Sequence, residues 1–177
     1  MAEKMSVINE SEQHALVGRA FYFNSSGDFL GEHGDGDWIM IAESTSDPGL
    51  HISTASEEVI GNVMTTIGGG IGISGAIGVS GFQGEYANAY ATHDNGQVSV
   101  NYNSNLIYNG NYHDIVSILH HEHYHQMTQG YETTWLQNEY QAFIYQINHS
   151  SFQNVSDELR EFTLTNYSNL HNSQTYP

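Results

Sequence analysis

The spacing of apolar and polar residues predicts short strands in the first part of the chain. Apolar runs occupy residues 21–23, 29–30 and 38–41, and stretches rich in Gly, Ser, Asn and Asp separate them. Short apolar runs separated by turn-forming residues are typical of β segments joined by turns. We therefore expect a turn-rich β leader segment over residues 1–43, followed by one larger domain over residues 44–177.

An uncharged stretch follows, and its first part has the period of a helix. Ser56 is a suitable N-cap, and apolar residues recur at helical spacing from Val59 to Ile67, so we expect a helix that ends at glycines 68–70. Residues 59–84 carry no charge and are long enough to span a membrane, but their glycines and polar residues favour a buried strand or closely packed backbone.

The next pattern predicts a β-hairpin. Before the turn sequence Asp94-Asn95-Gly96 the alternating residues are Tyr86, Asn88, Tyr90 and Thr92, and after it they are Val98, Val100 and Tyr102. We expect a half-buried antiparallel pair. Its second strand, residues 98–102, is the candidate sheet edge for holding an extended peptide by β-augmentation.

A helical period begins after the hairpin. Asp114 is a suitable N-cap, Ile115, Ile118 and Leu119 repeat at helical spacing, and Gly130 can end the helix.

Two further helices are predicted in the last third of the chain. One begins near Thr133 or Thr134. The other is amphipathic and begins at Ser156, with Leu159 and Phe162 among its apolar residues.

Composition excludes several classes of function. Three Lys and Arg face twenty Asp and Glu, for a formal charge of -17, so the chain would repel phosphate backbones, and nucleic-acid binding is not expected. No cysteine is present, which removes disulfides and thiolate ligands. The acidic turn at residues 35–37 does not match a calcium loop, because Ile39 and Ile41 occupy positions where oxygen ligands should recur.

The predicted helix after the hairpin carries four histidines and one glutamate in residues 120–126. His121 and His125 are four residues apart, so their imidazoles leave one face about 6 Å apart and can chelate an ion. Together with Glu122 they form the H-E-x-x-H pattern of zincin metallopeptidases, in which the glutamate acts on water rather than on the metal. His120 and His123 point to other faces, as residues supporting the ligands or facing solvent.

Three related metal sites do not fit. A metzincin would have a glycine and a histidine where this chain has Thr128 and Tyr131. A peptide deformylase would supply a cysteine ligand, and a di-iron bundle would need a second E-x-x-H motif.

The segment Asn138-Glu139-x-x-Ala142 resembles the glutamate helix of gluzincins. The resemblance implies an α+β, zincin-like fold, with a small, mostly antiparallel sheet packed on the H-E-x-x-H helix and on a following helix. It also implies Glu139 as third zinc ligand and Ala142 as the small residue that lets the helices approach. His149 and Glu132 are alternative ligands, and Glu139 as a surface carboxylate is the plain alternative.

The implied activity is zinc-dependent peptide hydrolysis, with Glu122 as general base. A tyrosine or histidine should stabilise the oxyanion, and the candidates are Tyr131, Tyr145 and His149. A competing hypothesis is a membrane-active or binding module that uses residues 59–84, with a structural metal; membrane contact is not favoured.

A small metallopeptidase behind a turn-rich segment also resembles the toxin domains of bacterial polymorphic toxins. That resemblance implies a protein or peptide substrate and a cognate immunity protein as partner. The start of the chain has no apolar run typical of a signal peptide, so we expect a protein that is cytoplasmic before export and leaves the bacterial cell by another route.

Overall fold

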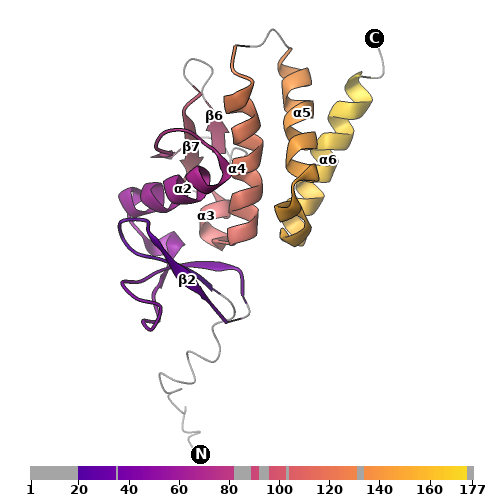
Figure 1. The fold of residues 1–177 in the computed structure, drawn as a ribbon. Coiled ribbons are helices and arrows are strands. Elements are labelled where there is room, and N and C mark those ends of the chain that lie inside the picture. Colours follow the sequence, from indigo (N-terminus) through magenta and orange to yellow (C-terminus); the bar gives the residue numbers. More distant parts are fainter. Residues whose placement is uncertain are drawn as a thin grey trace, which may run out of the picture.

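The computed structural model describes residues 20–34, 36–81, 89–91, 96–102, 104–130 and 134–174. Within these residues the chain has two small sheets and five α-helices, which confirms the predicted α+β class. The helices α4 (Tyr112–Met127), α5 (Trp135–Asn148) and α6 (Asp157–Gln174) lie side by side, with both sheets and α2 (Glu57–Ile71) on the α4 side (Figure 1).

The first sheet contains the strands predicted for the leader segment. Its strand order is β2-β1-β3-β4, with β1 and β3 parallel and the other pairs antiparallel. The strands are β1 (Ala20–Phe23), β2 (Phe29–His33), β3 (Trp38–Ile41) and β4 (Leu50–His51). Phe23 and Ile39 are buried in the same apolar cluster as Met64 and Leu119, so the core continues across the predicted boundary at residue 43.

The second sheet contains the predicted hairpin and a third strand. Its strands are β5 (Gly78–Ser80), β6 (Ala89–Ala91) and β7 (Val98–Asn101). The hairpin is confirmed, because β6 pairs antiparallel with β7, although turn residues 92–95 lie outside the described residues. The prediction that residues 98–102 form a sheet edge is wrong: β5 pairs parallel with the other side of β7, and all four β7 residues are buried. Both sheets are thus mixed, each with one parallel pair.

The helix α2 (Glu57–Ile71) contains much of the uncharged stretch. Its start is as predicted, since the Ser56 side chain accepts a hydrogen bond from the backbone N–H of Val59 at 3.4 Å. It does not end at glycines 68–70 but continues to Gly72, whose φ of 101° closes it in the left-handed conformation. A Cβ on Gly68 would lie 2.6 Å from Ile77 Cδ1, so this glycine allows close packing inside the helix.

The uncharged stretch, residues 59–84, contributes side chains to the hydrophobic core. Its buried side chains are Ile60, Val63, Met64, Ile67, Ile73 and Ile77. No helix in the described part of the chain is both long and apolar enough to cross a membrane. The segment from residue 82 to residue 84 lies outside the described residues.

The short helix α3 (Asn105–Asn109) precedes α4 (Tyr112–Met127), which carries the histidine cluster. The N-cap of α4 is Asn111, not Asp114 as predicted, because the Asn111 side chain accepts a hydrogen bond from the Asp114 N–H at 3.1 Å. Asp114 is buried in the first turn and accepts from the N–H and hydroxyl of Ser156 at 2.7 and 2.6 Å. Burial raises the pKa of Asp114 although both Ser156 bonds oppose the change. These contacts tie α4 to the start of the last helix.

The last helix, α6 (Asp157–Gln174), begins at Ser156 as predicted. Leu159 is buried, but Phe162 is 47% exposed, so its predicted place on the apolar face is wrong. Thr163 occupies the buried position next to it, at 1% exposure. Two short 3-10 helices, η1 (Ile52–Thr54) and η2 (Ser150–Asn154), are also present.

The helix α5 (Trp135–Asn148) packs antiparallel against α4. The direction follows from two contacts: Asn138 near the start of α5 meets His125 near the end of α4, and Gln146 near the end of α5 meets Ser117 near the start of α4. Ala142 lies between these contacts with no exposed surface, as expected for a small residue where two helices approach closely.

Candidate metal centre

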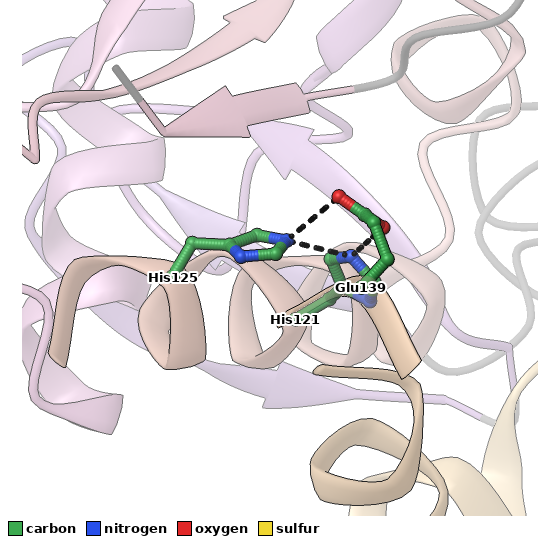
Figure 2. A group of neighbouring side chains, drawn as sticks. All are labelled: His121, His125 and Glu139. Atoms are coloured by element: carbon green, nitrogen blue, oxygen red, sulfur yellow. Dashed lines mark hydrogen bonds and ion pairs between the residues drawn. The ribbon is translucent and has the colours of Figure 1, made fainter. Parts of the chain in front are cut away.

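Three side chains from α4 and α5 converge on one point (Figure 2). His121 Nε2 lies 3.1 Å from His125 Nε2, and the two nitrogens lie 3.3 and 3.2 Å from the carboxylate oxygens of Glu139. All three ligand atoms are within 4.8 Å of one another, and this is the only such group of three among the described residues. The group could hold a metal ion.

Helix geometry accounts for this convergence. His121 and His125 are one turn apart on α4, so their rings leave the same face. Glu139 reaches them from the facing side of α5, which begins at a capping box: the Thr134 side chain accepts from the Gln137 N–H, and the Gln137 side chain accepts from the Thr134 N–H. The cap fixes where α5 starts and therefore where Glu139 points.

A chain of hydrogen bonds sets the tautomer of His125. The Thr128 hydroxyl donates to the Tyr124 carbonyl at 2.8 Å, so its oxygen accepts from Asn138 Nδ2 at 3.4 Å. This orients the amide so that Asn138 Oδ1 faces His125 Nδ1 at 2.6 Å. An amide oxygen only accepts, so Nδ1 carries a proton, and Nε2 is the ring nitrogen that can bind a metal ion. A metal ligand needs this tautomer.

Replacing Asn138 by alanine is therefore expected to lower metal affinity about 10- to 100-fold without abolishing binding. The bond to His125 is lost, but all three ligands remain. Competition against a fluorescent zinc chelator measures the change. Gln141→Ala is the matched control, since this exposed amide lies on the same helix. Equal affinity of the Asn138 variant and wild type would show that the amide does not support the ligand.

The electrostatics of the group favour a cation. Burial alone would raise the pKa of Glu139, but hydrogen bonds and charge interactions with His121 and His125 lower it to about 2, so the carboxylate is ionised at neutral pH. Burial lowers the pKa of His125, whereas its hydrogen bond to Glu139 and the charges of Glu122 and Glu139 outweigh burial and raise it. A partly buried carboxylate and two imidazoles without a thiolate are a donor set that a divalent metal would satisfy.

Glu122 lies next to the ligands without joining them. Its side chain is buried at 6% exposure, and its charge contributes to the raised pKa of His125, so the carboxylate is within electrostatic reach of the group. At 100° per residue it leaves α4 beside the face of His121 and His125. A carboxylate in this place can exchange protons with a molecule bound at the ligands.

His121 is supported differently from His125. Its Nδ1 is buried and has no hydrogen-bond partner among the described residues, and its ring packs on Phe143 with ring centroids 4.6 Å apart. Phe143 follows Glu139 by one turn of α5. The His121 ring is thus supported by an apolar contact with Phe143, whereas the His125 ring is supported by a hydrogen bond to Asn138. The sequence pattern alone predicted no role for Phe143 or for Asn138. The position of Asn138 directly before Glu139 was the only available signal.

The other two histidines of the cluster lie on other faces of α4, as predicted. His120 is buried rather than facing solvent, and its ring contacts the ring of His149, with centroids 3.4 Å apart and an angle of 31° between the planes. Burial, with smaller contributions from the charges of His149 and His123, lowers the pKa of His120 to about 4. His123 packs against Gly72 and lies 3.5 Å from the Tyr145 hydroxyl through Nδ1.

The two candidate oxyanion residues that the structure describes, Tyr145 and His149, have contacts with other side chains. Tyr145 has His120, His123 and Tyr124 as ring neighbours. His149 accepts a hydrogen bond from the Ser151 N–H through Nδ1 at 3.2 Å and caps η2, and it does not belong to the ligand group.

The remaining candidates, Tyr131 as oxyanion stabiliser and Glu132 as alternative ligand, lie outside the described residues.

Comparison with known proteins gives no relative: no protein-family model, curated protein or solved structure matches the chain. Any assignment of function therefore depends on the chemistry and geometry of the site.

Proposed function

We propose that this protein is a zinc-dependent metallopeptidase with a zincin-like arrangement, in which His121, His125 and Glu139 bind the ion and Glu122 is the general base. The observation that carries the proposal is the convergence of three ligand atoms from two helices, with a buried glutamate beside them. A structural ion would need the three ligands but would not need the carboxylate of Glu122 next to them.

We propose zinc as the ion because of the chemistry of the ligands and the distances between them. Two imidazoles and one carboxylate are a common donor set of catalytic zinc, which keeps its fourth position open. Bonds of about 2.0–2.2 Å in tetrahedral geometry place ligand atoms about 3.3–3.6 Å apart. The Nε2 atoms of His121 and His125 are 3.1 Å apart, and they lie 3.3 and 3.2 Å from Glu139 Oε2 and Oε1 respectively, distances that are close to that spacing.

The proposed chemistry divides into two tasks. The bound ion would supply Lewis acidity, polarising the scissile carbonyl and lowering the pKa of the attacking water. Glu122 would accept the proton of that water and pass it to the leaving amine. The partly buried ligands and the apolar contact of Phe143 with His121 would limit access of bulk water.

An extended peptide would need a sheet edge near the ligands. Since β7 is central, the proposed edge is β6, which pairs with β7 alone among the described strands and packs against α4. A substrate strand would add to β6 through backbone hydrogen bonds.

We also propose the biological setting suggested by the resemblance to polymorphic toxins. In that setting the peptidase is delivered from a bacterial cell and cleaves a protein of the recipient, and a cognate immunity protein neutralises it. The formal charge of -17 would favour an inhibitor with a basic surface.

Metal removal tests the proposed activity. We expect the zinc-loaded chain to cleave an unfolded protein such as casein, activity to disappear after dialysis against 1,10-phenanthroline, and about one equivalent of zinc to restore it. New amino termini measured by mass spectrometry report the cleavage. Cleavage that survives complete removal of metal would refute the proposal, as would a zinc-loaded chain that cleaves nothing.

A further inference from the structure

The buried face of α4 ends in two polar residues. Ile115 and Leu119 are fully buried in the hydrophobic core, which also includes side chains of α2 and β7. Glu122 follows Ile115 by seven residues and Gln126 follows Glu122 by four, so both side chains continue this face. Glu122 is buried and Gln126 is partly buried. The proposed general base and Gln126 are therefore neighbours, one turn apart, on the side of α4 that faces the core.

The side-chain amide of Gln126 joins α4 to two distant segments. Its Nε2 donates to the backbone carbonyl of Gly96 at 2.8 Å and to that of Ser74 at 3.1 Å. Its Oε1 accepts from the Ser74 N–H at 2.8 Å. Ser74 lies between α2 and β5, and Gly96 lies two residues before β7. Since both amide hydrogens and the amide oxygen are engaged, Gln126 holds these segments in place and does not itself take part in proton transfer.

Glycines allow both segments to approach α4 closely. Gly96 has a φ of 63°, and a Cβ there would lie 3.3 Å from Gln126 Cγ and 2.7 Å from a side-chain oxygen further along the chain. On the other segment, Gly72 has a φ of 101°, and a Cβ there would lie 3.1 Å from His123 Cε1. The backbone at these two points thus fits against the last turns of α4 only as glycine. The contact made by Gln126 is therefore supported from both segments.

We propose that Gln126 is a positioning residue: by holding two backbone segments against α4, it keeps the carboxylate of Glu122 buried and directed towards the ligand group. The inference rests on the proposed peptidase function for the role of Glu122. Without these hydrogen bonds the segments separate from α4, and bulk water reaches the carboxylate and frees its side chain. A general base acts only from a fixed position, because a displacement of about 1 Å can lower a rate about 10²-fold.

Steady-state kinetics give the first test. A quenched fluorescent peptide that contains one bond cleaved in casein is hydrolysed by zinc-loaded wild type, Gln126→Met and Gln146→Met. Gln146 is the matched control, because this buried amide also holds α4, through the Ser117 hydroxyl at 3.0 Å, but joins it to α5. We expect both variants to lose stability and only Gln126→Met to lose about 10- to 100-fold in kcat, with KM and zinc affinity close to those of wild type. A kcat equal to that of Gln146→Met would overturn the inference, as would loss of zinc from Gln126→Met.

Gly96→Ala changes the same contact without altering Gln126, and it serves where Gln126→Met does not fold. Its control is Gly49→Ala: Gly49 has a φ of 67°, and a Cβ there would lie 3.1 Å from the Ile41 carbonyl oxygen, but it precedes β4 in the first sheet. Both substitutions strain the backbone, so both are expected to lower stability. We expect kcat to fall, at unchanged KM, in Gly96→Ala alone. Equal kcat values in the two glycine variants would contradict the inference.

Chemical labelling gives a test that does not depend on hydrolysis. The zinc-loaded proteins are treated with a water-soluble carbodiimide and glycine ethyl ester, and mass spectrometry measures the modification of Glu122. We expect labelling to be at least about 10-fold faster in Gln126→Met than in wild type and Gln146→Met, and the exposed Glu57 to react equally in all three. Equal rates at Glu122 would overturn the inference even where wild type cleaves casein. Faster labelling in Gln126→Met together with an inactive wild type would refute the peptidase and leave the positioning of Glu122 by Gln126 standing.

Discussion

Replacing Glu122 by glutamine is expected to lower peptide hydrolysis by about 10²- to 10⁴-fold while the chain keeps its zinc. The substitution preserves size and removes the basic oxygen that accepts the proton of the attacking water. It removes no ligand, because His121, His125 and Glu139 form the group without it. Casein cleavage and zinc content, measured on the same preparation, separate the two effects. If the toxin setting is right, expression of wild type in a bacterial cytoplasm arrests growth and the variant does not.

Glu57→Gln is the matched control for this experiment. Glu57 is an exposed carboxylate in the first turn of α2, so the same chemical change there is expected to leave hydrolysis and zinc content unaltered. Full activity in the Glu122 variant would remove its assigned role as general base. Loss of zinc together with activity would instead make Glu122 a ligand or a structural residue.

The second large effect is expected on metal content. Alanine in place of His121, His125 or Glu139 removes one of three protein ligands, so zinc per chain should fall towards zero after exhaustive dialysis. His120→Ala and His123→Ala should each keep about one zinc, because their side chains leave other faces of α4. Elemental analysis of the five variants measures the difference.

Folding must be checked in the same set of variants. His120 is buried at 4% exposure and its ring contacts that of His149, so its alanine variant is expected to lose stability without losing its metal ligands. His123→Ala is the cleaner control, since this ring is only partly buried. Should both controls lose zinc while His121→Ala and His125→Ala keep it, the ligand assignment is wrong.

Local patterns predicted the elements whose signals are contained within a few residues. The strands around residues 21–23 and 38–41, the hairpin and the starts of α2, α5 and α6 all agree with the structure, because caps, turns and alternation act over short distances. The pairing of His121 with His125 has the same origin, since it follows from the helical repeat alone.

Features that depend on distant parts of the chain were predicted poorly. β7 was taken for a sheet edge because its parallel partner β5 is only three residues long and carries no alternating pattern. The end of α2 was placed too early because glycine normally ends helices, whereas Gly68 is needed for contact with Ile77. The N-cap of α4 was predicted at Asp114, but the carboxylate of Asp114 instead accepts a hydrogen bond from Ser156, which lies 42 residues later in the chain.

In the candidate metal centre, too, the features that depend on distant parts of the chain were the ones that the sequence pattern did not predict. Glu139 was expected only through the resemblance to gluzincins, because its approach to the histidines depends on how α5 packs on α4. The role of Asn138 was not predicted, since it depends on an amide orientation fixed by Thr128. Tyr145 and His149 were chosen by residue type, and their surroundings depend on tertiary packing that the sequence does not reveal.

The most direct test of the central claim, that His121, His125 and Glu139 bind a zinc ion, is a crystal structure of the zinc-loaded chain with anomalous data collected at the zinc absorption edge. We expect one anomalous peak per chain, bonded at about 2.0–2.2 Å by Nε2 of His121, Nε2 of His125 and the carboxylate of Glu139, with its remaining position open towards Glu122. A peak held by other residues, or no peak between α4 and α5 at saturating zinc, would contradict the account.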